Sequence, residues 1–262
     1  MALEPDMMER AHKGSALTVE SAGYTSLLAG ATGLIGRALL KQLIADSSIS
    51  KITVLSRRPV AMEGLGRPSE LAKVEVIVAS LDDMALALEQ VKADMVFCTL
   101  GTTIKIAKTK EAFRKVDYEY PLSLALFAER TDAALFSVVT AMGASTDSAF
   151  FYSRVKGELQ EQLVKLSIPH IQVFQPSLLL GERSEARPGE ALGAWVSKGL
   201  QYAMVGPLRK YRAIKGEAVA FAMRLAAFQA LGAATSAEGG SAAAIQYYPS
   251  DKIAELAVHT TG

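Results

Sequence analysis

The chain has one cysteine, Cys98, among 262 residues, so it cannot form an internal disulfide bond. It also lacks an excess of either charge, because 28 Lys and Arg residues stand against 27 Asp and Glu residues. A near-neutral balance argues against a general nucleic-acid or membrane-surface binder. The three histidines show no metal-ligand spacing, and no metal site is expected.

Long hydrophobic runs are absent too. No run approaches the roughly 20 apolar residues that a membrane-spanning helix needs. The first residues have no basic start followed by an apolar core, so they do not resemble a secretory signal. We expect a polar N-terminal extension at residues 1–22 and a cytoplasmic location.

Hydrophobic residues, by contrast, make up 50% of the chain, which suffices for the core of one α/β domain with a small appendage. Short apolar runs alternate with segments of helical periodicity. The expected strands are 24–29, 51–56, 74–79, 94–99, 134–139, 170–174 and a last one near 243–248. The expected helices are 34–45, 82–91, 110–130 with a break near Pro121, 150–166, 191–202 and 217–231.

Most of the expected strands are continuously apolar, which is typical of a parallel sheet covered by helices on both faces. Right-handed crossovers then predict an α/β fold of the Rossmann type, with a doubly wound parallel sheet. We assign residues 23–175 to this Rossmann-type core. Residues 176–262 are predicted to form a small C-terminal substrate lobe packed on the core.

Three glycines lie three residues apart between the first strand and the first helix, in the run LAGATGLIGR. Glycine permits a tight turn and lets a diphosphate approach the backbone, while the following helix offers free N–H groups. A purely structural turn is the alternative. We predict a dinucleotide-binding turn, with cofactor contacts from Gly30, Thr32, Gly33, Leu34, Ile35 and Gly36.

Arg57 and Arg58 follow the second strand, where an NAD-binding protein usually carries an acidic residue for the ribose 2′-OH. Two guanidinium groups could instead hold a 2′-phosphate. A solvated basic loop is the alternative. The pair therefore favours NADP(H) as the cofactor.

Tyr152 and Lys156 are spaced i and i+4, which places them on the same face of a helix. An adjacent ammonium stabilises a phenolate, so the tyrosine could exchange a proton with a substrate oxygen. The alternative is a packed tyrosine and a solvated lysine. We predict that Tyr152 and Lys156 are catalytic and that Lys156 also contacts the cofactor.

The motifs GATGLIGR, VFCTLGTT, VTAMGA, FFYSRVKGELQ and QPSLLLGERSEARPGE together resemble a subgroup of the atypical short-chain dehydrogenases/reductases, related to the Tat-interacting-protein oxidoreductase. The resemblance covers about residues 24–230. It implies cofactor contacts after the third, fourth and sixth strands, from Leu81, Asp82, Leu100, Gly101, Thr102, Pro176, Ser177 and Leu178.

The same resemblance implies a catalytic hydroxyl after the fifth strand. Ala141 stands where family members carry the second of two hydroxyl residues, so Thr140 is the candidate, with Ser145 as an alternative. Gln175 replaces the family's arginine beside the nicotinamide. The departure at Ala141 puts efficient carbonyl chemistry in doubt, and Gln175 removes any charge role at its position.

The leading hypothesis is an NADPH-dependent oxidoreductase that acts on a small carbonyl compound or alcohol. The second is an NADPH-binding regulatory or sensor protein with little turnover. A nucleotide-sugar epimerase ranks last, because residues 176–262 leave little room for a second nucleotide. The expected partner is a small-molecule substrate, and a protein partner or a homodimer stays open.

Overall fold

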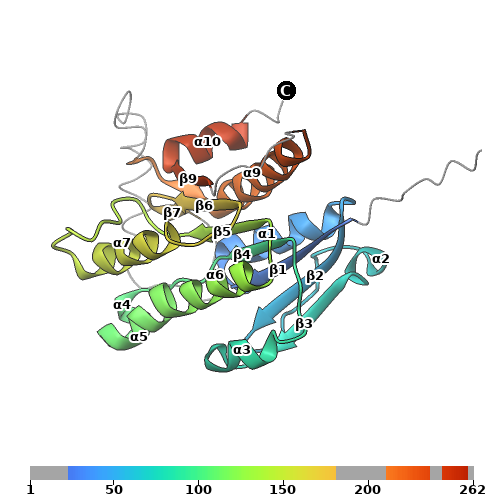
Figure 1. Cartoon of the computed structure of the whole chain (residues 1–262), viewed down its shortest axis with the longest axis horizontal. Coiled ribbons are helices and arrows are strands. Elements are labelled where there is room, and N and C mark those ends of the chain that lie inside the picture. The colour runs from blue at the N-terminus through green and yellow to red at the C-terminus, as the bar shows by residue number, and fades with distance from the viewer. Residues whose placement is uncertain (1–22, 181–210, 237–243, 259–262) are drawn as a thin grey trace, which may run out of the picture.

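The computed structural model describes residues 23–180, 211–236 and 244–258. Seven strands form one sheet in the order β3-β2-β1-β4-β5-β6-β9, and every neighbouring pair is parallel (Figure 1). The Rossmann-type parallel sheet is thereby confirmed. Its strands are β1 (Tyr24–Ala29), β2 (Ile49–Ser56), β3 (Val74–Val78), β4 (Met95–Cys98), β5 (Leu135–Val139), β6 (His170–Gln175) and β9 (Ala244–Pro249).

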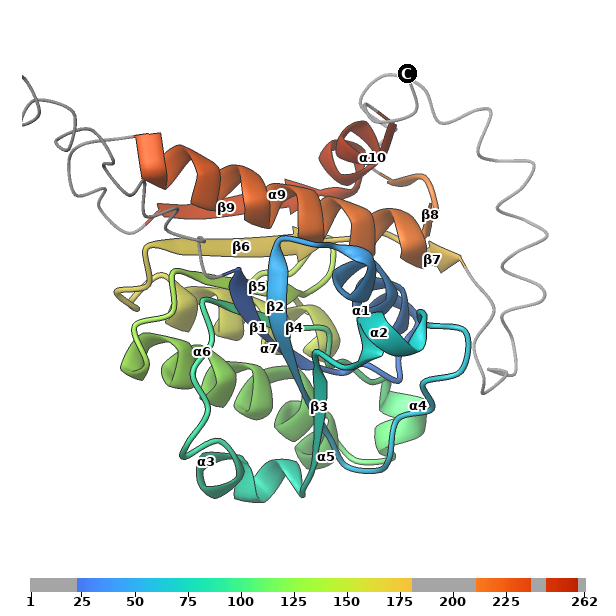
Figure 2. The same ribbon diagram turned by 90° about the vertical axis from the view of Figure 1, so that its right-hand side faces the viewer.

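Helices cover both faces of this sheet, and each face has its own hydrophobic core (Figures 1 and 2). One core lies under α1 (Leu34–Ala45) and α9 (Gly216–Ser236) and includes Leu28. The other lies under α3 (Met84–Ala87), α6 (Tyr120–Arg130) and α7 (Phe151–Leu163) and includes Leu27 and Ala29. Successive residues of β1 thus enter opposite cores, which explains why its last three residues, Leu27, Leu28 and Ala29, are all apolar.

Pro121 breaks the helix predicted for 110–130, as expected. The segment divides into α5 (Lys110–Arg114), the π-helical turn η2 (Lys115–Glu119) and α6. Proline has no N–H group to donate to the carbonyl of Asp117, four residues earlier, so the chain forms a wider turn there. As a result Asp117 is buried against neighbouring elements.

The helix predicted for 82–91 is wrong in length. The chain forms a 3₁₀ turn, η1 (Leu81–Asp83), and then only the single turn of α3. Leu88 leaves the helical conformation with φ −103° and ψ 9° and is buried in the core. The chain then turns towards β4.

Four short elements and a terminal helix were not predicted. They are α2 (Pro68–Leu71), α4 (Ile104–Ala107), the strand pair β7 (Leu179–Leu180) and β8 (Ile214–Lys215), and α10 (Ser250–Val258). The predicted helix 191–202 and the extension 1–22 lie outside the described residues.

The described C-terminal segments pack on the sheet and on α1. β9 pairs with β6 from His170↔Ala244 to Gln175↔Pro249, and α9 contacts α1 (Figure 2). A separate substrate lobe stays a prediction, because 181–210 lie outside the described residues. Among the described helices, none is both long and apolar enough to cross a membrane.

Candidate functional site

The sheet topology brings most of the predicted site residues to one edge. Because the strands are parallel, the segments that follow β1 to β6 leave the sheet at the same side. β1 and β4 are neighbours, so the chain winds outwards in opposite directions from this point. Such a switch point is where open α/β sheets bind nucleotides.

The three glycines of the first turn differ in what the fold requires of them. Gly30 has φ +93°, and a Cβ there would lie 2.6 Å from Thr99 Oγ1. A Cβ at Gly36 would overlap the carbonyl oxygen of Gly30. At Gly33 the backbone is extended, and the nearest atom to a Cβ, Gly30 O, would be 3.3 Å away. The protein alone therefore explains Gly30 and Gly36, whereas Gly33 leaves exposed space for a ligand.

The start of α1 suits an anion. Gly33 is its N-cap and offers no side-chain hydrogen bond, and the first turn has no acidic residue. The positive end of the helix dipole is thus uncompensated by the helix's own side chains. Thr32 and Gly33 are exposed, while the Ile35 side chain lies in the core and leaves only its backbone for a ligand. These residues fit the diphosphate of a dinucleotide.

Arg57 and Arg58 lie after β2, and both are exposed. The loop that follows them is held by Arg37, whose guanidinium donates to Ala61 O at 2.8 Å and to Glu63 O at 2.9 Å. Sequence reasoning missed Arg37, although it directly follows the third glycine. Its two hydrogen bonds link the start of α1 to the loop that carries the arginine pair.

Asp82, predicted on the adenine side, already has two partners. Its carboxylate lies 2.7 Å from Lys115 Nζ and accepts a hydrogen bond from Tyr120 OH at 2.9 Å. The hydrogen bond from Lys115 is the main cause that lowers the pKa of Asp82. Leu81, next to it, is buried in the core. Lys115 and Tyr120 carried no signal in the sequence, because only the fold brings η2 and α6 beside η1.

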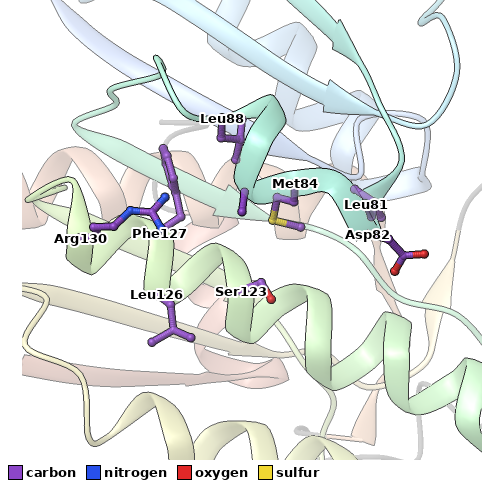
Figure 3. A pocket seen from close by; sticks show the side chains of 9 residues that line it. Leu81, Asp82, Met84, Leu88, Ser123, Leu126, Phe127 and Arg130 are labelled. Carbon is purple, nitrogen blue, oxygen red and sulfur yellow. The ribbon is translucent and has the colours of Figure 1, made fainter.

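A pocket of about 230 Å³ runs between α3 and α6 (Figure 3). Leu81 and Asp82 line one end of it, and Arg130 lines the other. None of the other predicted cofactor residues lines it, and neither Tyr152 nor Lys156 does. The pocket therefore shares only Leu81 and Asp82 with the predicted cofactor residues, and it lies apart from Tyr152 and Lys156.

Lys156 is a buried, paired cation. Its residue exposure is only 4%, and Nζ lies 2.7 Å from Asp117 Oδ1. The other oxygen, Oδ2, accepts a hydrogen bond from Thr102 N at 2.9 Å. Burial by itself lowers the pKa of Lys156, but Asp117 and Tyr152 outweigh it, and the pKa is raised. The side chain is thus an ammonium. Asp117 was not identified from the sequence.

Tyr152 lies on the same face of α7 as Lys156, as the spacing predicts. Lys156 Nζ is 5.4 Å from the centre of the Tyr152 ring. The ring packs on Phe113 of α5, with 5.5 Å between centroids, yet 40% of the residue remains exposed. Phe113 therefore holds the Tyr152 ring in place, while part of the residue stays accessible to a substrate.

Thr140, the predicted catalytic hydroxyl, is engaged inside the protein. It is 4% exposed, accepts a hydrogen bond from Gln160 Nε2 at 2.9 Å and donates to Phe174 O at 3.4 Å. Gln175 Nε2 in turn donates to Gln160 Oε1 at 3.3 Å. Gln175, which replaces the family's arginine, thus belongs to a network of uncharged groups that runs through Gln160 to Thr140.

The alternative hydroxyl, Ser145, is exposed in the loop after β5. Its backbone N–H donates to Ser153 O at 3.1 Å. A Cβ at Gly157 would lie 2.5 Å from Thr146 N, so the loop packs tightly on α7 one residue after Lys156. Sequence reasoning also missed Gly157.

The remaining predicted cofactor residues divide into open and occupied groups. Gly101 and Leu178 are exposed. Leu100 is half-buried, as is Thr102, whose N–H is taken by Asp117. Pro176 O accepts a hydrogen bond from Met142 N, and Ser177 Oγ contacts Arg212 O and Ser250 Oγ. The side chain of Ser177 therefore joins the end of β6 to the start of α10.

Within residues 23–180, 211–236 and 244–258, no group of three or more His, Cys, Asp or Glu side chains is placed to hold a metal ion. Cys98 is fully buried at the end of β4, and burial raises the pKa of its thiol to about 12. It is therefore a protonated core residue.

Comparison with known proteins identifies a family of nucleotide-binding proteins. The chain matches the NAD(P)H-binding family over residues 30–166, which is more than half of its length. It is 35% identical over 163 residues to Protein HTATIP2 of Rattus norvegicus, a match that covers 62% of this chain and 66% of that protein. It is 31% identical over 176 residues to Protein FMP52, mitochondrial, of Candida albicans, which covers 65% and 76%.

Solved structures agree on the fold. A short-chain type dehydrogenase/reductase from Mycobacterium ulcerans has a TM-score of 0.60 at 16% identity, covering 88% of this chain and 90% of that one. A UDP-N-acetylglucosamine 4-epimerase from Methanobrevibacter ruminantium has a TM-score of 0.59 at 14% identity, covering 87% and 76%. At such identities the likeness shows the fold alone.

The location of the protein stays a prediction, because the names of the fungal relatives carry the word mitochondrial. The glycine turn, the switch point of the sheet and the family match all indicate that the chain binds a nicotinamide dinucleotide. The chain belongs to the NAD(P)H-binding family, as an oxidoreductase-like protein similar to HTATIP2 and FMP52 within the atypical short-chain dehydrogenases/reductases.

Proposed function

We propose that this protein is an NADPH-dependent oxidoreductase that interconverts a small carbonyl compound and the corresponding alcohol. The observation that carries the proposal is the pairing of an open Tyr152 with a buried, charged Lys156 on one face of α7. A general acid and a group that stabilises its anion are what carbonyl reduction requires of the protein.

A bound nicotinamide supplies hydride to the carbonyl carbon. The work of the chain is to move and hold protons. Tyr152 donates its phenolic proton to the substrate oxygen, and the ammonium of Lys156 stabilises the phenolate that remains. Phe113 holds the ring in place through the contact at 5.5 Å.

The choice of NADPH rests on Arg57 and Arg58. Both side chains are exposed after β2, the strand next to β1, and Ser56 before them is not acidic. A guanidinium can bind a 2′-phosphate through two hydrogen bonds, whereas the hydroxyl of NADH gives it no charge to pair with.

A sensor protein that binds NADPH with little turnover is the second candidate. The hydroxyl of Thr140 is already bonded to Gln160 and Phe174, and Ala141 offers none. If the exposed Ser145 does not orient the substrate carbonyl either, the protein binds the cofactor but turns over little substrate. An epimerase is less favoured, because its support is a likeness of fold at 14% identity.

The deciding experiment is Tyr152→Phe, which removes the proton donor and keeps the ring. A panel of aldehydes, ketones and alcohols would be screened for NADPH oxidation or NADP reduction. For any substrate found, turnover should fall by about 100-fold or more, the scale of losing a general acid, while NADPH affinity stays within about two-fold.

The matched control is Tyr247→Phe, an exposed tyrosine on β9. It should leave turnover unchanged. Tight NADPH binding without turnover of any compound in the panel would support the sensor. An established turnover that survives Tyr152→Phe would overturn the role of this tyrosine.

A further inference from the structure

We propose that Asp117 is the positioning residue of this site: its carboxylate holds the Lys156 ammonium against Tyr152 and ties it to the loop after β4. The catalytic consequence rests on the proposed function. The charge and position of Lys156 can be tested without any turnover.

The carboxylate of Asp117 is fixed at both oxygens. Oδ1 lies 2.7 Å from Lys156 Nζ, and Oδ2 accepts from Thr102 N at 2.9 Å. Asp117 is only 2% exposed, so water does not compete for these contacts. A lysine side chain otherwise has many rotamers, and a buried ammonium needs a counter-charge. Asp117 supplies both the direction and the charge.

The π-helical turn is what places this carboxylate. η2 is anchored at its start, where Arg114 pairs with Glu158 of α7 and Lys115 pairs with Asp82 of η1. It is ended by the missing N–H of Pro121 in α6. Extra residues in a helical turn re-aim the side chains they carry, and such turns are frequent at functional sites. Asp117 thereby points at Lys156 from a neighbouring element.

The titratable groups that face Lys156 come from three elements. They are Asp117 from η2, Tyr152 from α7 itself and Cys98 from β4. The thiol is protonated, because burial raises the pKa of Cys98 to about 12. Among these three groups, Asp117 is therefore the one that forms an ion pair with Lys156.

The Lys156 ammonium has three N–H donors and forms an ion pair with Asp117. Its remaining donors would serve the oxygen of Tyr152 and a hydroxyl of the nicotinamide ribose. Removing the carboxylate should have two effects. The ammonium loses its orientation, and burial then favours the uncharged amine.

The test is Asp117→Asn, which keeps the size of the side chain and an oxygen for Thr102 N but removes the charge. The ionisation of Lys156 would be followed by NMR of the lysine Cε carbon, with Lys156→Met to assign the signal. In the unmodified protein the lysine should stay charged from about pH 6 to about pH 10, and in Asp117→Asn it should titrate within that range.

Glu75→Gln is the matched control. It removes the carboxylate of another lysine ion pair, that of Glu75 on β3 with Lys51 on β2, and should leave the Lys156 signal unchanged. If Asp117→Asn does not fold, the unmodified protein still decides, because a Lys156 that titrates well below pH 10 refutes the proposal. A Lys156 that stays charged in folded Asp117→Asn refutes it as well.

Cofactor affinity gives a second, independent arm. Asp117→Asn should bind NADPH about 10-fold more weakly at pH 9 than at pH 6, beyond any change in the unmodified protein. In the Lys156→Met background the substitution should have no further effect, because the partner is gone. An equal loss of NADPH affinity in the unmodified and the Lys156→Met protein would mean that Asp117 acts by stabilising the fold and not through Lys156. Neither arm requires a substrate, so a failure of the oxidoreductase proposal leaves this one decidable.

Discussion

The phosphate turn (residues 30–37) and the lysine cluster (Thr102, Asp117, Tyr152 and Lys156) lie at the same edge of the sheet and would bind the cofactor by opposite means. The turn offers backbone N–H groups and an absent side chain at Gly33, and Thr32 and Gly33 are exposed. The lysine cluster uses long side chains, and its Lys156 and Asp117 side chains are buried against each other.

The difference teaches where each region is vulnerable. In the turn, added atoms do the damage, because Gly30 and Gly36 have other chain atoms where a Cβ would stand. In the lysine cluster, loss of a charge is the damaging change, because an unpaired buried ion is costly. Substitutions that add side-chain atoms without changing charge, and substitutions that remove a charge without changing size, therefore test whether the two regions differ in this way.

The largest expected effect is on stability. Gly36→Ala should lower the free energy of unfolding by about 3 kcal/mol or more, because the new methyl group overlaps Gly30 O. Gly33→Ala is its matched control and should cost at most about 1 kcal/mol, since the nearest atom is 3.3 Å away. Denaturant unfolding measures both. Equal losses would show that the two glycines do not differ as the geometry indicates.

The next effect concerns the ligand. Gly33→Val places a branched side chain where we expect the diphosphate, and it should weaken NADPH binding by at least about 100-fold, or about 2.7 kcal/mol. Calorimetric titration measures the affinity, and circular dichroism confirms that the variant folds. A folded variant that binds NADPH normally would remove Gly33 from the binding site.

A smaller effect is expected for the arginine pair. NADPH should bind at least about 10-fold tighter than NADH, which is about 1.4 kcal/mol, and Arg57→Ala with Arg58→Ala should erase most of that difference. Arg130→Ala, an arginine at the end of α6, serves as the control. Equal affinities for the two cofactors in the unmodified protein would contradict the assignment.

The smallest effect is expected for Arg37→Gln. The substitution removes the paired hydrogen bonds to Ala61 and Glu63 and leaves Arg57 and Arg58 in place. We expect the preference for NADPH to fall by about three-fold, in line with a net hydrogen-bond contribution of about 1 kcal/mol or less. A loss as large as that of the double variant would instead indicate that Arg37 contacts the phosphate itself.

Much of the fold could be predicted because its signals are local. An apolar run that ends at Gly30, followed by helical spacing, marks β1, the turn and α1 within 22 residues. The spacing of Tyr152 and Lys156 likewise needs only a helix. The short helix α3 was overestimated, because the position at which the chain turns depends on where Leu88 is buried in the core.

The partners of the site residues could not be predicted in the same way. Asp117 lies 39 positions before Lys156, and Gln160 lies 20 positions after Thr140. Nothing in the sequence near Asp117 distinguishes it from a solvated aspartate in a helix. Pro121 predicted a break in the helix, but the position of a break does not predict which neighbouring side chain will be buried.

The sequence by itself determined the alternation of strands and helices, the glycine turn and the face of α7 that carries Tyr152 and Lys156, because each follows from backbone geometry over a few residues. Only the tertiary structure decided that Lys156 pairs with Asp117, that the backbone N–H of Thr102 donates to Asp117, and that the Thr140 hydroxyl accepts a hydrogen bond from Gln160. Those contacts depend on the packing of β4, η2, α6 and α7 around a shared core, where burial makes each unpaired charge or hydroxyl costly and so selects its partner.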